Sequence, residues 1–298
     1  MSNPPDPLRW GATFPERGWA LVRFATYATA FVGLYVGGFK LLAATTGVHM
    51  SDAPGTPVSD LLLVQATFLA CVVIANLLGM IVWRRPIAEV GLQPRAVQRD
   101  LALGLLTGAS LMALLLVILI GLGVLKISGI VLLPDQILSY GAAYVLMFAM
   151  AAVAEQGLMR AFALTQLSRA ISFWPSALLM ATLFGLMHLG NGAESGFGAV
   201  VAAVFGLASA YAFKRSGALW FALGFHAAWD FVEAWVFGVP SSGRVATGAL
   251  THGTLTGPVA LTGGSAGPEG SYLALVAMAL LFVVIHYAVK PPLATSDH

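Results

Sequence analysis

The chain has 298 residues, of which 58% are hydrophobic and 9% are charged. Soluble domains carry about 25% charged residues, so the composition excludes an ordinary soluble domain and indicates a membrane protein. The formal net charge of +2 is spread over connecting segments and gives no reason to expect a nucleic-acid partner. The single cysteine, Cys71, lies in an apolar run and cannot form an intramolecular disulfide.

Eight apolar segments are predicted to be membrane-crossing helices, because a helix needs about 20 apolar residues to span the hydrocarbon core. In chain order they cover residues 24–43, 61–83, 101–125, 137–165, 174–190, 196–213, 218–238 and 271–289. The predicted fold class is therefore an all-α, polytopic membrane helical bundle.

The composition divides the chain into five regions. They are a polar N-terminal segment (1–23), N-terminal membrane helices (24–136), a helical core with polar residues in apolar surroundings (137–238), a Gly/Ser/Thr-rich loop (239–270) and the last membrane helix with its tail (271–298). Stretches rich in Gly, Ser and Thr between apolar segments are typical of loops.

The basic residues predict how the bundle is oriented. With eight crossings both termini lie on one side of the membrane; eleven Lys and Arg residues fall on that side and three fall near the other. The eleven are Arg9, Arg17, Arg23, Arg84, Arg85, Arg95, Arg99, Arg169, Lys214, Arg215 and Lys290. The three are Lys40, Lys126 and Arg244. Because connections rich in Lys and Arg stay in the cytoplasm, we predict that both termini are cytoplasmic.

The stretch from Val153 to Arg160 places a carboxylate, an amide and a guanidinium in an otherwise apolar segment. A charged side chain near the bilayer centre costs roughly 2.5–3.5 kcal/mol on insertion scales, so such residues are functional candidates by default. The carboxylate belongs to Glu155. Gln156 and Arg160 are four residues apart and share a helix face, so that Arg160 can lie beside the amide.

Two later segments each carry a histidine among apolar residues. His188 follows Phe184 by about one helical turn, and His226 precedes Asp230 by the same spacing. Residues four apart share a helix face, so His226 and Asp230 point the same way, with Glu233 near that face. A glutamate, two histidines and an aspartate supply a base and water-polarising groups, the parts needed for hydrolysis with or without a metal ion.

Two non-enzymatic interpretations use the same residues. An intramembrane Glu–Arg pair is often structural, so Glu155 and Arg160 are also compatible with a non-catalytic membrane scaffold. Small-molecule transporters place polar groups near the middle of the membrane too, although their halves show a repeat symmetry that we do not find in this sequence. A scaffold would tolerate the loss of Glu155, whereas an enzyme that uses it would not.

In order and spacing, the three motifs resemble the CPBP family of membrane proteases, which includes the type II CAAX prenyl proteases and bacterial abortive-infection-like proteins. That family shows Glu-Glu-x-x-x-Arg, Phe-x-x-x-His and His-x-x-x-Asn/Asp on successive membrane helices. Residues 155–160, 184–188 and 226–230 look like these motifs, and the resemblance covers roughly residues 137–238. The sequence departs from the pattern at Gln156, where the family usually has its second glutamate.

The resemblance implies an intramembrane endopeptidase, a hydrolase of the CAAX-processing type. Glu155 and His188 would activate a water that attacks a peptide carbonyl. His226 and Asp230 would stabilise the tetrahedral oxyanion, or these four residues would hold a zinc ion, so a metalloprotease and a metal-free glutamate protease are both open. The residues expected to orient or support the site are Gln156, Arg160, Phe184 and Glu233.

The resemblance also implies where the protein works. Its expected partners are a membrane-associated protein or peptide substrate and the lipid bilayer, and no nucleic acid. The expected location is a bacterial cell membrane, with the cavity of the helical bundle open to the cytoplasmic side. The stretches 238–243 and 261–270 look like segments found in bacterial members of the family.

The depths of Glu155 and His188 pose a geometric problem. At about 1.5 Å per residue, ideal straight spans would place these two side chains at different depths in the membrane. Either the segment 137–165 begins outside the membrane, or the segment 174–190 begins below the surface near Ser176. The sequence does not decide between these two arrangements.

Overall fold

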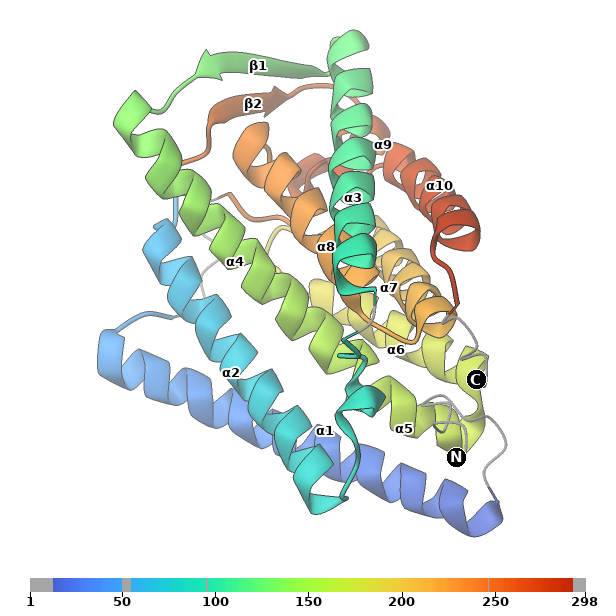
Figure 1. Cartoon of the computed structure of the whole chain (residues 1–298). Helices are drawn as coiled ribbons and strands as arrows, with labels where there is room; N and C mark the ends of the chain where they lie inside the picture. Colours follow the sequence, from blue (N-terminus) through green and yellow to red (C-terminus); the bar gives the residue numbers. More distant parts are fainter. Residues whose placement is uncertain (1–12, 50–54, 95, 246, 292–298) are drawn as a thin grey trace.

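A computed structural model describes residues 13–49, 55–94, 96–245 and 247–291 of the chain (Figure 1). Arg9 and Arg95, which enter the count of basic residues, lie outside these ranges, as do parts of the predicted N-terminal segment and tail.

The described residues fold as an all-α helical bundle, which confirms the predicted fold class. The helices are α1 (Phe14–Thr46), α2 (Val58–Val82), α3 (Val97–Gly121), α4 (Pro134–Arg160), α5 (Phe162–Ile171), α6 (Phe173–His188), α7 (Gly196–Ser216), α8 (Trp220–Asp230), α9 (Val259–Thr262) and α10 (Tyr272–Ala288). The stretches long and apolar enough to cross a membrane are Pro15–Thr46, Val58–Val82, Val97–Gly121, Pro134–Ile171 and Gly196–Ser216. Because α6 and α10 are shorter apolar helices, the predicted number of eight spans is approximate.

The first helix begins earlier than predicted. α1 starts at Phe14, inside the segment expected to precede residue 24, and Pro15 stands in its first turn, where proline is favoured. Arg23 donates a hydrogen bond of 2.9 Å to Glu16 two turns before it. Two opposite charges of this segment are therefore paired along the helix itself.

The predicted segment 137–165 consists of two helices. α4 ends at Arg160, Ala161 leaves the helical conformation, and α5 continues from Phe162. The start of a helix leaves backbone N–H groups without partners in the helix. Here the N–H of Phe162 donates to Oδ1 of Asn76 on α2 at 3.2 Å, so a side chain distant in sequence stabilises the break.

A two-stranded antiparallel sheet lies at one end of the bundle, and we did not predict it from the sequence. β1 (Leu125–Ile130) follows α3, and β2 (Thr251–Leu255) lies within the predicted loop 239–270 (Figure 1). Gly253 in β2 has no room for a side chain, because a Cβ there would collide with the carbonyl oxygen of Phe237. The loop is thus folded onto the bundle.

Small residues allow α3 and α8 to cross closely. A Cβ at Gly104 or Gly108 of α3 would collide with backbone atoms of α8, and a Cβ at Gly224 of α8 would collide with backbone atoms of α3. Glycine at such crossings lets helix backbones approach each other in membrane proteins. This crossing fixes the position of α8, which carries His226 and Asp230.

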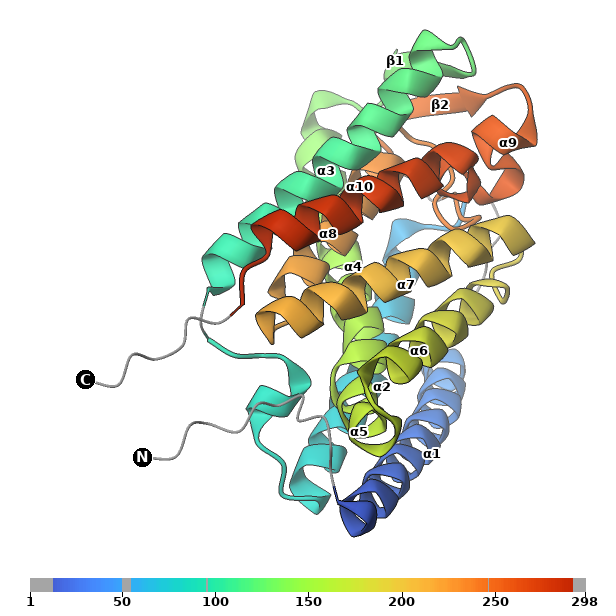
Figure 2. The same cartoon turned by 90° about the vertical axis from the view of Figure 1, so that its right-hand side faces the viewer.

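α6 and α7 lie side by side in a second close contact (Figure 2). A Cβ at Gly185 of α6 would collide with the carbonyl oxygen of Ala199 on α7. Because Gly185 lies one turn before His188, the end of α6 is held firmly against its neighbour.

Candidate functional site

Side chains from three helices line one cavity. Glu155 comes from α4, His188 is the last residue of α6, and His226 and Asp230 come from α8. The structure therefore brings together the four residues that the sequence singled out as catalytic candidates. Glu155 and His188 reach the same cavity although ideal straight spans would place them at different depths. The reason is that α6 begins only at Phe173, after the separate helix α5, and its last residue, His188, lines the cavity together with Glu155.

The ring of His226 is held from two sides. Its Nε2 lies 3.6 Å from Oε2 of Glu155 and 3.4 Å from Oδ2 of Asp230, four residues later. Its Nδ1 lies 3.3 Å from the side-chain nitrogen of Gln156. An amide nitrogen only donates, so Nδ1 accepts and the proton of the neutral ring sits on Nε2, facing the two carboxylates.

The ring of His188 is the opposite tautomer, with its proton on Nδ1. Its Nδ1 lies 2.8 Å from the carbonyl oxygen of Phe184, one turn earlier on α6. A carbonyl only accepts, so Nδ1 carries the proton of the neutral ring and Nε2 carries the lone pair. The fixed orientation and the lone pair suit His188 to accept a hydrogen bond from a reacting water.

Glu155 presents an oxygen that has no hydrogen bond. Among the described residues, Oε2 of Glu155 has no hydrogen-bond partner although it is buried. The side chain as a whole is 24% exposed, so the carboxylate is reachable from the cavity. Leaving a buried polar group unsatisfied costs about 1–3 kcal/mol, and native proteins keep such groups where function requires them.

Arg160 does not pair with the amide of Gln156, contrary to the expectation from their spacing. Gln156 Nε2 reaches Ser209 Oγ at 3.5 Å, and the guanidinium of Arg160 lies over the ring of Phe184, 4.5 Å from its centroid. In the described ranges neither terminal nitrogen of Arg160 has a hydrogen-bond partner. Phe184 also contacts the His188 ring, with centroids 4.5 Å apart, so Phe184 links the buried cation to the histidine.

Glu233 lies outside the lining of the cavity. It lies in a π-helical turn (Phe231–Val236) after α8, is fully buried and is not among the residues that line the cavity. Its Oε1 accepts a hydrogen bond of 3.3 Å from the backbone N–H of Glu269. Glu233 therefore holds the loop 239–270, which supplies Glu269 to the cavity, and its supporting role stays a prediction.

That loop adds two cavity residues that sequence reasoning missed, Glu269 and Ser242. The Ser242 hydroxyl donates a hydrogen bond of 2.6 Å to Oε1 of Glu269, and the Ser242 backbone N–H donates to the same oxygen. Burial, together with the negative charge of Asp230, raises the pKa of Glu269, which lies outside the membrane-spanning helices, to about 8. The signals in the sequence were the likeness of the stretches 238–243 and 261–270 to segments of bacterial members of the family.

A larger cleft joins the cavity at Glu155, His188 and Asp230. It encloses about 1420 Å³ of empty space, including the part open to solvent, and runs between α1, α2, α4 and α6. Its apolar walls include Tyr35, Phe39, Phe68, Phe148 and Met187. Mostly apolar walls that lead to a few polar groups are typical of a site for an apolar ligand.

The candidate residues do not form a metal site in this arrangement. In the ranges that the structure describes, no group of three or more His, Cys, Asp or Glu side chains is placed to hold a metal ion. A zinc site needs such donors about 2.0–2.2 Å from one centre. Since Nε2 of His226 instead carries the ring proton and faces two carboxylates, we assign no step of a reaction to a metal.

Comparison with known proteins finds one family match, which covers the middle of the chain. Residues 137–232 match the family model of the Rce1-like type II CAAX prenyl endopeptidases. This region is Rce1-like. It contains Glu155, His188, His226 and Asp230, so the resemblance is confirmed over this part of the chain, and the match points to a membrane peptidase. No curated protein and no solved structure matches the chain.

Proposed function

We propose that the protein is an intramembrane endopeptidase that hydrolyses a peptide bond in a membrane-associated protein or peptide. The observation that carries the proposal is the meeting of Glu155, His188, His226 and Asp230 in one cavity, within the Rce1-like region. The adjoining apolar cleft fits the apolar part of such a substrate. CAAX processing is the activity in the family's name, and we propose the broader class of membrane-associated peptides.

Glu155 and His188 act on the attacking water. Oε2 of Glu155, which has no hydrogen bond among the described residues, accepts one proton of the water as its oxygen attacks the peptide carbonyl carbon. Nε2 of His188 accepts a hydrogen bond from the other O–H and orients the water. A positioned general base accelerates such a step typically 10²–10⁴-fold.

His226 acts on the carbonyl oxygen. Its Nε2–H, whose tautomer is fixed by Gln156, donates to that oxygen as it becomes negative. An ionised carboxylate has no proton to donate, so Asp230, 3.4 Å from Nε2, positions and polarises the ring rather than binding the oxyanion. Protonated Glu155 then gives its proton to the leaving nitrogen, the peptide bond breaks, and a carboxylic acid and an amine are released.

The test compares the termini of membrane proteins by mass spectrometry in cells that contain the native protein or the Glu155→Gln variant. We expect a set of new termini that depends on Glu155. The matched control is Asp135→Asn, which removes an exposed carboxylate charge from the same helix outside the cavity and should leave these termini unchanged. Identical termini with native protein and Glu155→Gln would contradict the proposal.

A further inference from the structure

The two ends of the bundle differ in their structure and in their charged residues. We call the end that carries the two-stranded sheet the sheet end. It holds β1 and β2, the turn between α6 and α7 (189–195) and the loop 239–270 (Figure 2). The turn and the loop touch each other, because the Ser265 hydroxyl donates to the carbonyl oxygen of Ala193 at 2.8 Å. These connections therefore form one continuous surface beside the sheet.

We call the opposite end the basic end. At this end α7 ends and α8 begins, and the connection between α2 and α3 lies there too. Arg215 Nε at the end of α7 donates to the carbonyl oxygen of Val289 after α10 at 3.0 Å. Trp220 Nε1 at the start of α8 donates to the carbonyl oxygen of Gln93 at 2.7 Å. Helix ends far apart in the sequence thus meet at this end.

The two ends differ in their basic residues. Within the described ranges, the basic end carries Arg17, Arg23, Arg84, Arg85, Arg99, Arg169, Lys214, Arg215 and Lys290. The residues nearer the sheet end are Lys40, Lys126 and Arg244. Because Lys and Arg accumulate in cytoplasmic connections, the basic end is the cytoplasmic one and the sheet end lies across the membrane.

The cavity and the cleft are both lined from the sheet end. Polar residues that line them from connections are Asn191, Glu194, Ser241, Ser242, Arg244 and Glu269. All six belong to the turn 189–195 or the loop 239–270. Of the described residues in the basic-end stretches 83–96, 161–172 and 213–219, none lines either space. The open path to Glu155 therefore leads through the sheet end.

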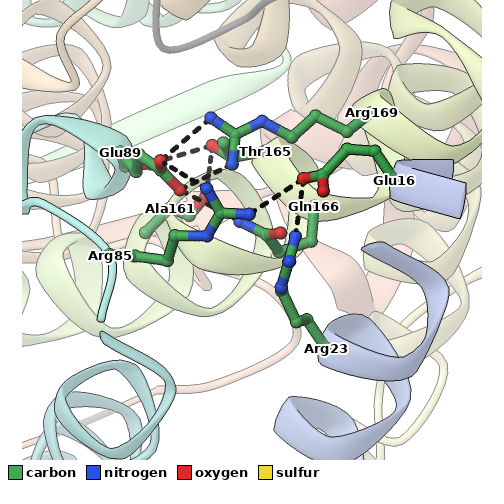
Figure 3. Close-up of polar contacts among 8 residues, drawn as sticks. All are labelled: Glu16, Arg23, Arg85, Glu89, Ala161, Thr165, Gln166 and Arg169. Carbon is green, nitrogen blue, oxygen red and sulfur yellow. Dashed lines mark hydrogen bonds and ion pairs between the residues drawn. The ribbon is translucent and has the colours of Figure 1, made fainter. Parts of the chain in front are cut away.

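A network of ion pairs fastens the basic end (Figure 3). Glu89, only 4% exposed, accepts hydrogen bonds from Arg169 at 2.8 and 2.9 Å and from Gln166 at 3.1 Å. Arg85 lies 3.6 Å from Glu89 and donates to Glu16 at 3.0 Å. The network joins the start of α1, the connection after α2 and α5.

Packed apolar side chains add to this closure. Phe162, Leu164 and Leu167 of α5 form one buried cluster with Phe173 of α6 and Phe213 of α7, and each is at most 3% exposed. α5 thus holds the ion pairs and contributes to the core beneath the site. The basic end is sealed by the same helix that interrupts the predicted segment 137–165.

We infer that the site opens to the non-cytoplasmic side of the membrane and takes membrane-anchored peptides whose scissile bond is presented from that side. The direction of the opening rests on the lining residues and the basic residues, whereas the cleavage rests on the function proposed above. The inference differs from the cytoplasmic opening that the family resemblance implies. A substrate would reach Glu155 past Asn191 and Arg244, which are joined by a hydrogen bond of 2.8 Å.

Cysteine labelling tests the direction of the opening without any assumption about activity. Cys71 is the only cysteine, and its Sγ donates to the carbonyl oxygen of Leu34 at 3.2 Å, a bond that Cys71→Ser retains. On this background, Ser265→Cys reports the sheet-end surface, Ser242→Cys reports the cleft, and Gln98→Cys reports the basic end. A membrane-impermeant maleimide is applied to right-side-out membrane vesicles with and without detergent.

We expect Ser265→Cys and Ser242→Cys to be labelled in sealed vesicles and Gln98→Cys to be labelled only after detergent is added. Labelling of Gln98→Cys alone in sealed vesicles would overturn the inference, because the sheet end would then face the cytoplasm. Labelling of Ser265→Cys without Ser242→Cys would overturn it too, since the cleft would not open on that surface.

The position of cleavage gives a second, separable readout. Termini that depend on Glu155 are mapped relative to the membrane segments of the proteins that carry them, and we expect them on the non-cytoplasmic side. Glu155-dependent termini on the cytoplasmic side would overturn the inference while leaving the proposed peptidase intact. Absence of any Glu155-dependent termini would overturn the peptidase, and the labelling result would still decide the direction of the opening.

Discussion

Two glutamates in this bundle, Glu89 and Glu155, have opposite surroundings. Both oxygens of Glu89 accept hydrogen bonds, from Arg169 and Gln166, and Arg85 adds a further positive charge. Glu155 has one oxygen without a hydrogen bond among the described residues, and its nearest ring nitrogen, on His226, is 3.6 Å away. The first carboxylate is fully satisfied, and the second remains available to a reacting molecule.

This difference indicates that Glu89 contributes to stability, whereas Glu155 is available for a chemical reaction. A buried carboxylate that is fully paired holds segments together, and removing its charge leaves its cationic partners uncompensated. A carboxylate that lacks partners costs stability where it stands, but it can accept a proton from water. The same substitution at the two positions should therefore have opposite consequences.

The largest effect is expected for Glu155→Gln. The substitution keeps the shape of the side chain and removes its basicity, so the rate of peptide cleavage should fall by about 10²–10⁴-fold. Folding should survive, because an amide removes the cost of placing a charge inside the membrane. Cleavage is measured at matched membrane levels together with the unfolding temperature. Full activity would show that the base is another group.

The same substitution at the paired glutamate, Glu89→Gln, is expected to affect stability instead of activity. It leaves Arg169 and Arg85 without their shared counter-charge, and breaking a buried ion pair costs about 3–5 kcal/mol. The free energy of unfolding should fall by about this amount, whereas activity per folded molecule should stay near the native value. Denaturant unfolding in detergent measures the first quantity and cleavage normalised to folded protein measures the second. Loss of activity without loss of stability in Glu89→Gln would contradict the different roles that we assign to Glu89 and Glu155.

Local signals in the sequence sufficed for part of this picture. Long apolar stretches predicted the helices, since every backbone group inside a membrane must be satisfied within the chain. The spacing of Glu155, His188, His226 and Asp230 in apolar surroundings predicted the cavity, because a buried polar group there has to be explained by function or by a partner.

Other features depend on contacts between residues far apart in the sequence. The break between α4 and α5 is stabilised by Asn76, a residue of α2 that carries no local sign of this role. β2 pairs with β1 although the helices α4 to α8 lie between the two strands in the sequence. Glu269 lies in a stretch that resembles a solvated loop, and only the fold places it in the cavity. No pattern of period 2 or 3.6 encodes such contacts.

Glu269 should make stability depend on pH. Its pKa of about 8 lies above its ordinary value of 4.5 because of burial and the charge of Asp230. The folded state therefore favours the protonated form, whose stabilisation is complete below about pH 4.5 and is lost as the pH rises through about 8. The unfolding temperature should decrease over that window. Glu269→Gln, which stays neutral, should flatten the curve; an unchanged curve would show that other groups cause it.

The smallest effect is expected for Gln156→Glu. The native amide donates to Nδ1 of His226 and keeps the ring proton on Nε2. A carboxylate at this position would accept from Nδ1–H instead, so it would favour a ring protonated on both nitrogens. Such a ring still donates from Nε2 to the oxyanion and adds a positive charge. Activity should therefore be retained or raised, within about tenfold, the scale of one net hydrogen bond.

The pH dependence of cleavage separates this explanation from a purely structural one. With glutamate at position 156, activity should fall as the pH rises and the extra ring proton is lost, a decrease that the native protein should not show. Gln156→Ala, which removes the contact without adding a charge, should lower turnover while leaving it measurable and create no such decrease. Complete loss of activity in Gln156→Glu would mean that catalysis requires the neutral ring of His226. Donation from Nε2 would then depend on the amide at position 156, and another hydrogen-bonding side chain could not replace it.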